Sequence, residues 1–90
     1  MELIETTYDG FLVFEKYTIK NKRTYYITVS NRHGEFLGNI LWETGWRCYT
    51  FHPAKDTTYD IKCLTVITSY LEELINQRRV KKWMMKSYLQ

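Results

Sequence analysis

Four side chains in this sequence could hold a metal ion through nitrogen or sulfur: His33, Cys48, His52 and Cys63. Zinc sites are usually built from close C-x-x-C or H-x-x-x-H pairs, and no two of these residues form such a pair. Cys48 and His52 fall on one face of an expected strand, but about 13 Å apart along it. The sequence therefore predicts no metal site, and we expect both thiols to be small buried side chains.

The residues that could support catalysis lack the surroundings that catalysis needs. Neither cysteine lies in a glycine-rich elbow or loop that could supply an oxyanion donor. Asp56 and Asp60 frame a threonine-rich loop, which indicates a solvated connection followed by a helix cap. The chain has four glycines and no Walker or dinucleotide pattern. We therefore expect a protein that is not an enzyme and that uses no cofactor.

The basic residues form two groups that could bind phosphate. Residues 1–76 hold eight Lys or Arg against ten Asp or Glu, whereas residues 77–90 hold five Lys or Arg and no acid. Attraction to nucleic acid, anionic lipid or an acidic partner is thus expected mainly at the C-terminus. Phe14, Tyr26 and Tyr49 could add a stacking platform if they lie on an open sheet face. The candidate binding residues are Arg78, Arg79, Lys81, Lys82, Trp83 and Lys86 in the tail, with Lys16, Lys20, Lys22 and Arg23 as a second basic group.

The tail also has the pattern of an amphipathic helix. Val80, Trp83, Met84 and Tyr88 recur at helical spacing among lysines, as in a helix that docks in a partner's groove or on an anionic surface. An open sheet face with aromatic rings is likewise often covered by a second copy or by another protein. The alternatives are structural: the tail packs on its own sheet, aromatic pairs stabilise that sheet, and a basic helix end suits the helix dipole.

One α+β domain spanning residues 1–90 is expected to position these side chains. Runs of β-branched and aromatic residues between turn residues predict a four-stranded antiparallel β-meander over residues 8–53. Phe11, Val13, Tyr17 and Ile19 alternate through the first of these strands. A single C-terminal helix over residues 60–77 should pack on one face of the sheet. Residues 78–90 form a basic amphipathic tail that either extends this helix or begins a separate one.

The helix has clear start and burial signals. Asp60 is a good N-cap, because its carboxylate can accept hydrogen bonds from N–H groups of the first turn. The apolar residues that follow at helical spacing are expected to face the sheet. The third and fourth strands are apolar on both faces, so the sequence leaves open which face the helix covers. The expected buried stripe is Ile61, Leu64, Ile67, Leu71 and Leu74.

The third and fourth strands carry a motif that resembles a known family. The stretch from Leu37 to Trp42, followed by Gly45 to Pro53, reads G-x-I-x-W … W-R-x-Y-x-F-x-P and precedes an aliphatic helix. It is similar to small phage- or prophage-encoded proteins of unassigned function, and the similarity spans roughly residues 36–75. The resemblance implies an origin in a mobile element. It supplies no catalytic residue, cofactor or substrate.

Two functions follow as hypotheses. The first is a non-enzymatic phage or mobile-element interaction protein that self-associates or acts on a host protein. The alternative is a nucleic-acid-binding protein that uses the basic C-terminal helix and the sheet aromatics. No apolar stretch reaches the roughly 20 residues that a membrane span needs, and the first eight residues do not resemble a signal peptide. We therefore expect the cytoplasm of a bacterial host as its location.

Overall fold

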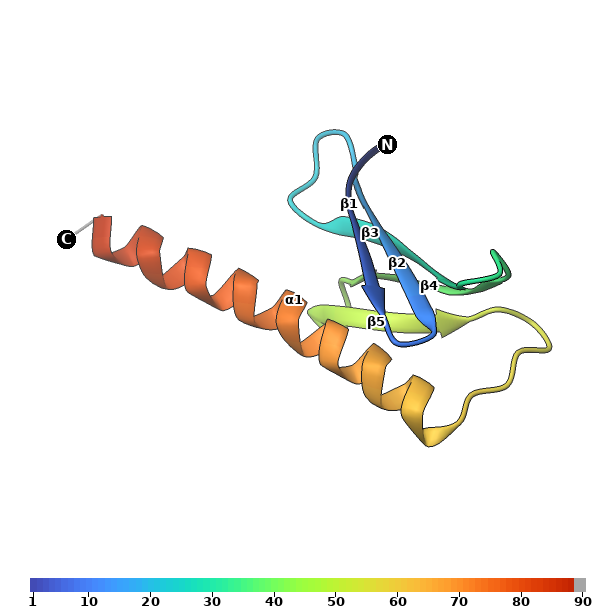
Figure 1. The fold of residues 1–90 in the computed structure, drawn as a ribbon. Coiled ribbons are helices and arrows are strands. Elements are labelled where there is room, and N and C mark those ends of the chain that lie inside the picture. Colours follow the sequence, from blue (N-terminus) through green and yellow to red (C-terminus); the bar gives the residue numbers. More distant parts are fainter. Residues whose placement is uncertain (89–90) are drawn as a thin grey trace.

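The computed structural model describes the backbone of residues 1–88 and the side chains of residues 1–79. In this part of the chain, five antiparallel strands follow one another in a meander, and one long helix crosses a face of the sheet (Figure 1). The predicted α+β class with one C-terminal helix is confirmed, whereas the prediction of four strands is wrong. The elements are β1 (Glu2–Asp9), β2 (Leu12–Thr18), β3 (Tyr25–Asn31), β4 (Phe36–Glu43), β5 (Cys48–Pro53) and α1 (Ile61–Tyr88).

The additional strand is β1, so the meander begins at Glu2 and not at Tyr8. It pairs with β2 over its whole length, and seven of its eight residues are exposed. An exposed edge strand has no buried face, and therefore no apolar alternation that would reveal it in the sequence. Gly10, with a φ of 58°, occupies the first position of the two-residue turn after Asp9, where a type II′ hairpin turn requires glycine.

The alternation of Val13 and Tyr17 in the sequence marks the face of β2 that is not buried. Leu12 and Phe14 are at most 1% exposed, whereas Tyr17 projects from the other face. Apolar residues occur in both phases of this strand, so local alternation does not determine its orientation. Pairing with β3 does, because it places Phe14 opposite the buried Val29. A shift of one residue would reverse both faces.

The hydrophobic core lies between α1 and one face of the sheet. Tyr70 of α1 stacks on Phe14 with the ring centroids 4.2 Å apart and the planes 4° from parallel. Phe14 and Tyr49 are therefore covered by the helix, and the prediction that they form an open stacking platform is wrong. Tyr26 projects from the opposite face, which no element among residues 1–88 covers. The buried apolar residues are Leu12, Phe14, Ile27, Val29, Ile40, Tyr49, Ile67 and Leu74.

The start of α1 is capped as predicted, but its first turns are rotated relative to the predicted stripe. The Asp60 carboxylate accepts a hydrogen bond of 2.8 Å from the Cys63 N–H, and this bond lowers the pKa of Asp60. Ile61 and Leu64 were expected to be buried, but they are 82% and 48% exposed. Cys63 and neighbouring positions at helical spacing pack on the core instead. Two sets of residues recur at helical spacing here, one with Ile61 and Leu64 and one with Cys63. Contact with the sheet determines that the set with Cys63 is buried.

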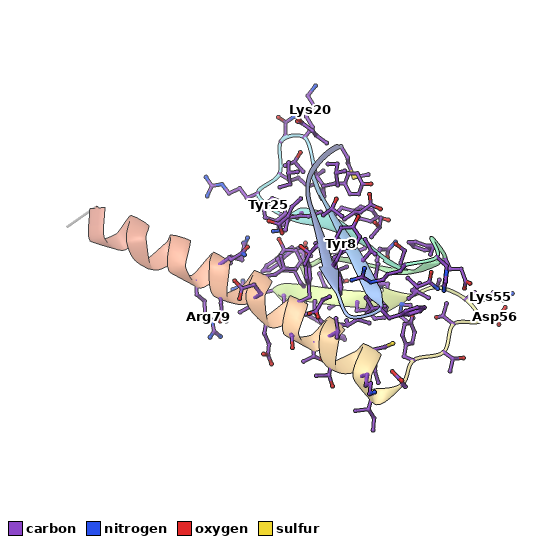
Figure 2. All side chains as sticks on the ribbon, in the orientation of Figure 1. Tyr8, Lys20, Tyr25, Lys55, Asp56 and Arg79 are labelled. Atoms are coloured by element: carbon purple, nitrogen blue, oxygen red, sulfur yellow. The ribbon has the colours of Figure 1, made fainter. Side chains whose placement is uncertain are left out.

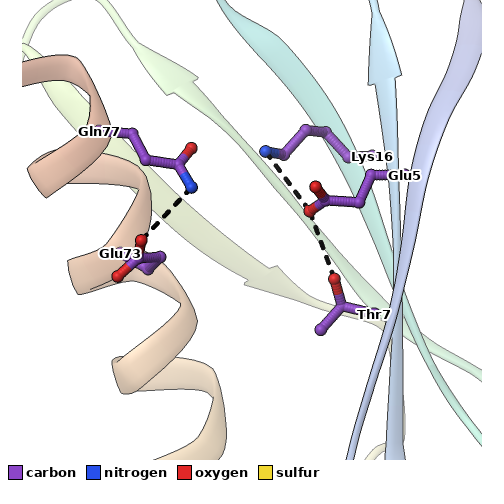
Figure 3. Close-up of polar contacts among 5 residues, drawn as sticks. All are labelled: Glu5, Thr7, Lys16, Glu73 and Gln77. Atoms are coloured by element: carbon purple, nitrogen blue, oxygen red, sulfur yellow. Dashed lines mark hydrogen bonds and ion pairs between the residues drawn. The ribbon is translucent and has the colours of Figure 1, made fainter. Parts of the chain in front are cut away.

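Lys16 is buried between the sheet and the helix. Its ammonium lies 3.7 Å from a carboxylate oxygen of Glu5 on β1 and 4.9 Å from the centre of the Tyr25 ring. Figure 3 shows this pair on the sheet, beside the helix that carries the Glu73 and Gln77 hydrogen bond. The Lys16 side chain is 7% exposed and that of Glu5 is 52% exposed, so the pair is only half desolvated.

We expect Lys16→Met to leave the free energy of unfolding unchanged or to raise it by about 1 kcal/mol. An apolar chain of similar length removes the cost of desolvating the ammonium. Glu5→Gln keeps the buried charge without its partner, and it should lower the free energy of unfolding by about 1 kcal/mol. Urea titrations measure both changes. Strong destabilisation by Lys16→Met combined with a neutral Glu5→Gln would contradict this view of the pair.

Candidate functional site

Two sheet turns and the middle of α1 meet at one end of the molecule. In an antiparallel meander, alternate turns lie at the same end, so the β2–β3 and β4–β5 turns are neighbours. Residues 75–79 of α1 pass beside the β4–β5 turn, because both line the same hollow. We call this region the basic end. Its basic residues are Lys20, Lys22, Arg23, Arg47, Arg78 and Arg79.

A stack of side chains fixes the position of Arg78. Its guanidinium carbon lies 4.2 Å from the centre of the Trp42 ring. Trp42 in turn meets Tyr49 edge-on, with the ring centroids 5.3 Å apart, and the Tyr49 hydroxyl accepts a hydrogen bond of 3.1 Å from the Tyr25 N–H. Burial raises the pKa of this Tyr49 hydroxyl. A guanidinium stacked on an aromatic face keeps its N–H donors directed outward in the plane of the group.

Guanidinium groups line three hollows at the basic end. The large hollow, of about 510 Å³, lies between the β4–β5 turn and α1, and Arg47, Arg78 and Arg79 line it together with Trp42. A small hollow of about 70 Å³ has both Arg23 and Arg78 in its wall. The two basic groups that the sequence shows far apart therefore share one surface. Lys22 and Arg23 line a third hollow of about 460 Å³, to which Trp42 also contributes.

The charges of the basic end are not neutralised by neighbours within the described side chains. None of its six basic residues forms an ion pair with a described carboxylate. Glu43 belongs to this end, but its carboxylate accepts the Gly45 N–H at 3.3 Å. Figure 2 shows Lys20 and Arg79 far from Lys55 and Asp56, which lie in the loop before α1. The acids of the turns are concentrated at that opposite end: Asp9, Glu35, Asp56 and Asp60.

Six of the predicted binding residues have described side chains, and five of these six lie at the basic end: Lys20, Lys22, Arg23, Arg78 and Arg79. Arg23 shares a hollow with Arg78, and Lys22 lines another hollow together with Arg23, whereas Lys16 of the same predicted group is buried and pairs with Glu5. Arg47 was not predicted. It is a single basic residue in a turn and belongs to no basic cluster of the sequence. Its left-handed conformation, with a φ of 54°, is seen only in the structure. The side chains of the other four predicted tail residues lie outside the described residues: Lys81, Lys82, Trp83 and Lys86.

The sheet face opposite α1 carries mainly polar and aromatic side chains. Tyr17 and Tyr26 lie with their ring centroids 6.3 Å apart, and the Asn39 amide donates a hydrogen bond of 2.8 Å to the Tyr26 hydroxyl. Thr50 and His52 are joined by a 2.8 Å hydrogen bond on β5. Of the three rings predicted to form a stacking platform, Tyr26 is the one that this face presents.

Among the described residues, no three His, Cys, Asp or Glu side chains lie close enough together to hold a metal ion. Cys48 and Cys63 are half-buried free thiols, and burial raises the pKa of Cys63. Within residues 1–88, no helix combines the length and the apolar character that a membrane crossing requires.

The fold and the site define a small α+β protein with a meander sheet, a helix on one face and a basic end. The chain is 41% identical over 70 residues to an uncharacterized 9.3 kDa protein of Acholeplasma phage L2. The aligned residues make up 77% of this chain and 90% of the phage protein. The chain belongs to the same family as this small phage protein. This relationship supports the phage origin predicted from the sequence. No family model matches the sequence, and no solved structure matches the chain.

Proposed function

We propose that the chain is a non-enzymatic phage protein that binds nucleic acid through its basic end. Of the two functions predicted from the sequence, this is the one that the geometry favours. The observation that carries the proposal is the shared hollow of Arg23 and Arg78. Arg23 and Arg78 are 55 positions apart in the chain. Their shared hollow joins the two basic groups into one surface beside Trp42.

The chemistry of this surface suits phosphate groups. Guanidinium groups bind phosphate oxygens through two parallel N–H donors, and the stack on Trp42 gives Arg78 a defined orientation for such contacts. Since no described carboxylate pairs with Arg23, Arg47 or Arg79, a phosphate need not displace an ion pair. Each neutralised phosphate releases condensed counterions, and this release provides most of the affinity in low salt.

The course of α1 extends the basic surface. The helix has 28 residues and is therefore about 42 Å long, and its last turns continue beyond the sheet (Figure 1). This part of the helix contains Lys81, Lys82 and Lys86 and no acidic residue. A nucleic-acid backbone that follows α1 away from the sheet would thus stay within a segment of positive charge.

Fluorescence anisotropy with labelled 20-nucleotide single strands and duplexes tests the proposal. We expect binding by the full chain in 50 mM salt that weakens steeply by 200 mM salt. The double variant Arg23→Ala, Arg78→Ala should bind roughly tenfold more weakly and should lower the slope of log K against log salt by about 1 to 2. The matched control Lys55→Ala, Lys62→Ala removes the same charge at the opposite end and should change affinity by less than about twofold.

Several outcomes would overturn the proposal. These are no binding in low salt, affinity that is independent of salt, or equal losses in the two double variants. Circular dichroism would show that both variants remain folded. A chain that binds no nucleic acid but has twice the mass of one chain in solution would favour the self-association hypothesis instead.

A further inference from the structure

We infer that the basic end takes single-stranded nucleic acid, with an unpaired base stacked on Trp46; this inference rests on the proposed function. Trp46, in the β4–β5 turn, is 77% exposed, more than any other aromatic residue among those described. None of the ring contacts within the described residues involves it. Its apolar surface is thus open to a ligand.

The turn that carries Trp46 has a defined shape. It joins the paired residues Glu43 and Cys48, and the Glu43 carboxylate accepts the Gly45 N–H within it. Arg47 adopts a left-handed conformation with a φ of 54°. Trp46 does not itself line the large hollow, but the next residue in the chain, Arg47, does.

The large hollow, which Arg47 lines, can receive the rest of a nucleotide. Its volume of about 510 Å³ falls within the range of small-ligand sites, and its walls combine apolar surface with three guanidinium groups. Ile75 and Trp42 supply the apolar part, while Arg47, Arg78 and Arg79 can bind phosphate oxygens. A ring for the base and cations for the backbone are the two components of single-strand sites.

The exposed indole discriminates between single strands and duplexes. In a duplex each base is paired and stacked on its neighbours, so that the protein meets mainly phosphates and groove edges. In a single strand the bases can turn outward and stack on aromatic side chains. Stacking of this kind is largely independent of base identity, because every base has a π-face. We therefore expect little sequence preference at this position.

Substitution of Trp46 tests the inference without disturbing the core. Trp46→Ala should weaken binding of a 20-nucleotide single strand roughly tenfold and should change duplex affinity by less than about twofold. Trp46→Phe should recover most of the loss, because a smaller ring still stacks. Phe36→Ala is the control, since it removes a half-exposed ring at the opposite end of the sheet and should leave both affinities unchanged.

Tryptophan emission gives an independent measurement. A stacked base should quench the emission of the unmodified chain, and Trp46→Ala should lose most of this change. Equal losses for single strand and duplex, or no loss for either, would overturn the inference and leave the proposed function standing. Absence of any nucleic-acid binding by the unmodified chain would overturn the proposed function itself. The two failures are therefore distinguishable in one titration series.

Discussion

Phe14→Ala is expected to lower the free energy of unfolding by about 4 kcal/mol. Phe14 of β2 is fully buried, and its ring stacks on Tyr70 of α1. Truncation removes both the buried ring and the main aromatic contact between the helix and the sheet. A small domain has only about 5–15 kcal/mol of stability, so the variant should be partly unfolded at 37 °C. Urea and thermal unfolding followed by circular dichroism measure the change.

Tyr70→Phe is the matched control for Phe14→Ala. The Tyr70 hydroxyl is buried and has no hydrogen-bond partner among the described residues, and this burial strongly raises its pKa. Removing the hydroxyl keeps the stack and eliminates an unsatisfied polar group, so stability should stay the same or rise by about 1 kcal/mol. A loss as large as that of Phe14→Ala would contradict this assignment of the contact.

Gly38→Ala is expected to lower the free energy of unfolding by about 3 kcal/mol. A methyl group at Gly38 would collide with the backbone carbonyl oxygen of His52 and would lie 2.9 Å from Cε1 of Phe51. The φ of 157° is also uncommon for residues with a side chain. Because the obstacle is backbone, β4 and β5 would have to separate. Urea unfolding measures the loss, and a changed chemical shift of the His52 amide would locate it.

Gly45→Ala provides the comparison for Gly38→Ala. Here the nearest atom to an added methyl is a Glu43 carboxylate oxygen at 3.6 Å, an ordinary contact. Its effect on stability should therefore stay within about 0.5 kcal/mol. If both glycine variants were equally destabilised, the cause would be backbone entropy or turn geometry and not the close approach of β4 and β5.

Local features of the sequence were sufficient to predict most elements. Alternation and turn residues predicted β2 to β5, and Asp60 predicted the start of α1, because these signals depend on neighbours in the chain. The strand β1 was not predicted, because its side chains are exposed on a sheet edge. The orientation of β2 was not predicted either, because it depends on pairing with β3, which joins residues distant in the chain.

The candidate site was predictable in its parts but not in its assembly. The charge pattern identified Lys22 and Arg23 in one group and Arg78 and Arg79 in another. Their meeting depends on where α1 crosses the sheet, which no local pattern specifies. Trp46 and Arg47 belong to the W-R-x-Y part of the family motif, but the motif assigned them no role, because their importance comes from the exposure and shape of one turn.

The composition of β1 affects how two copies of the chain can meet. Its outer edge has unpaired backbone groups, and such edges can recruit a second strand into an extended sheet. β1 carries three acids and no base, and it contains an irregularity between Leu3 and Glu5. Symmetric antiparallel pairing of two copies would place Glu2 opposite Asp9, a repulsive arrangement. The strand thus works against pairing of two copies through this edge of the sheet.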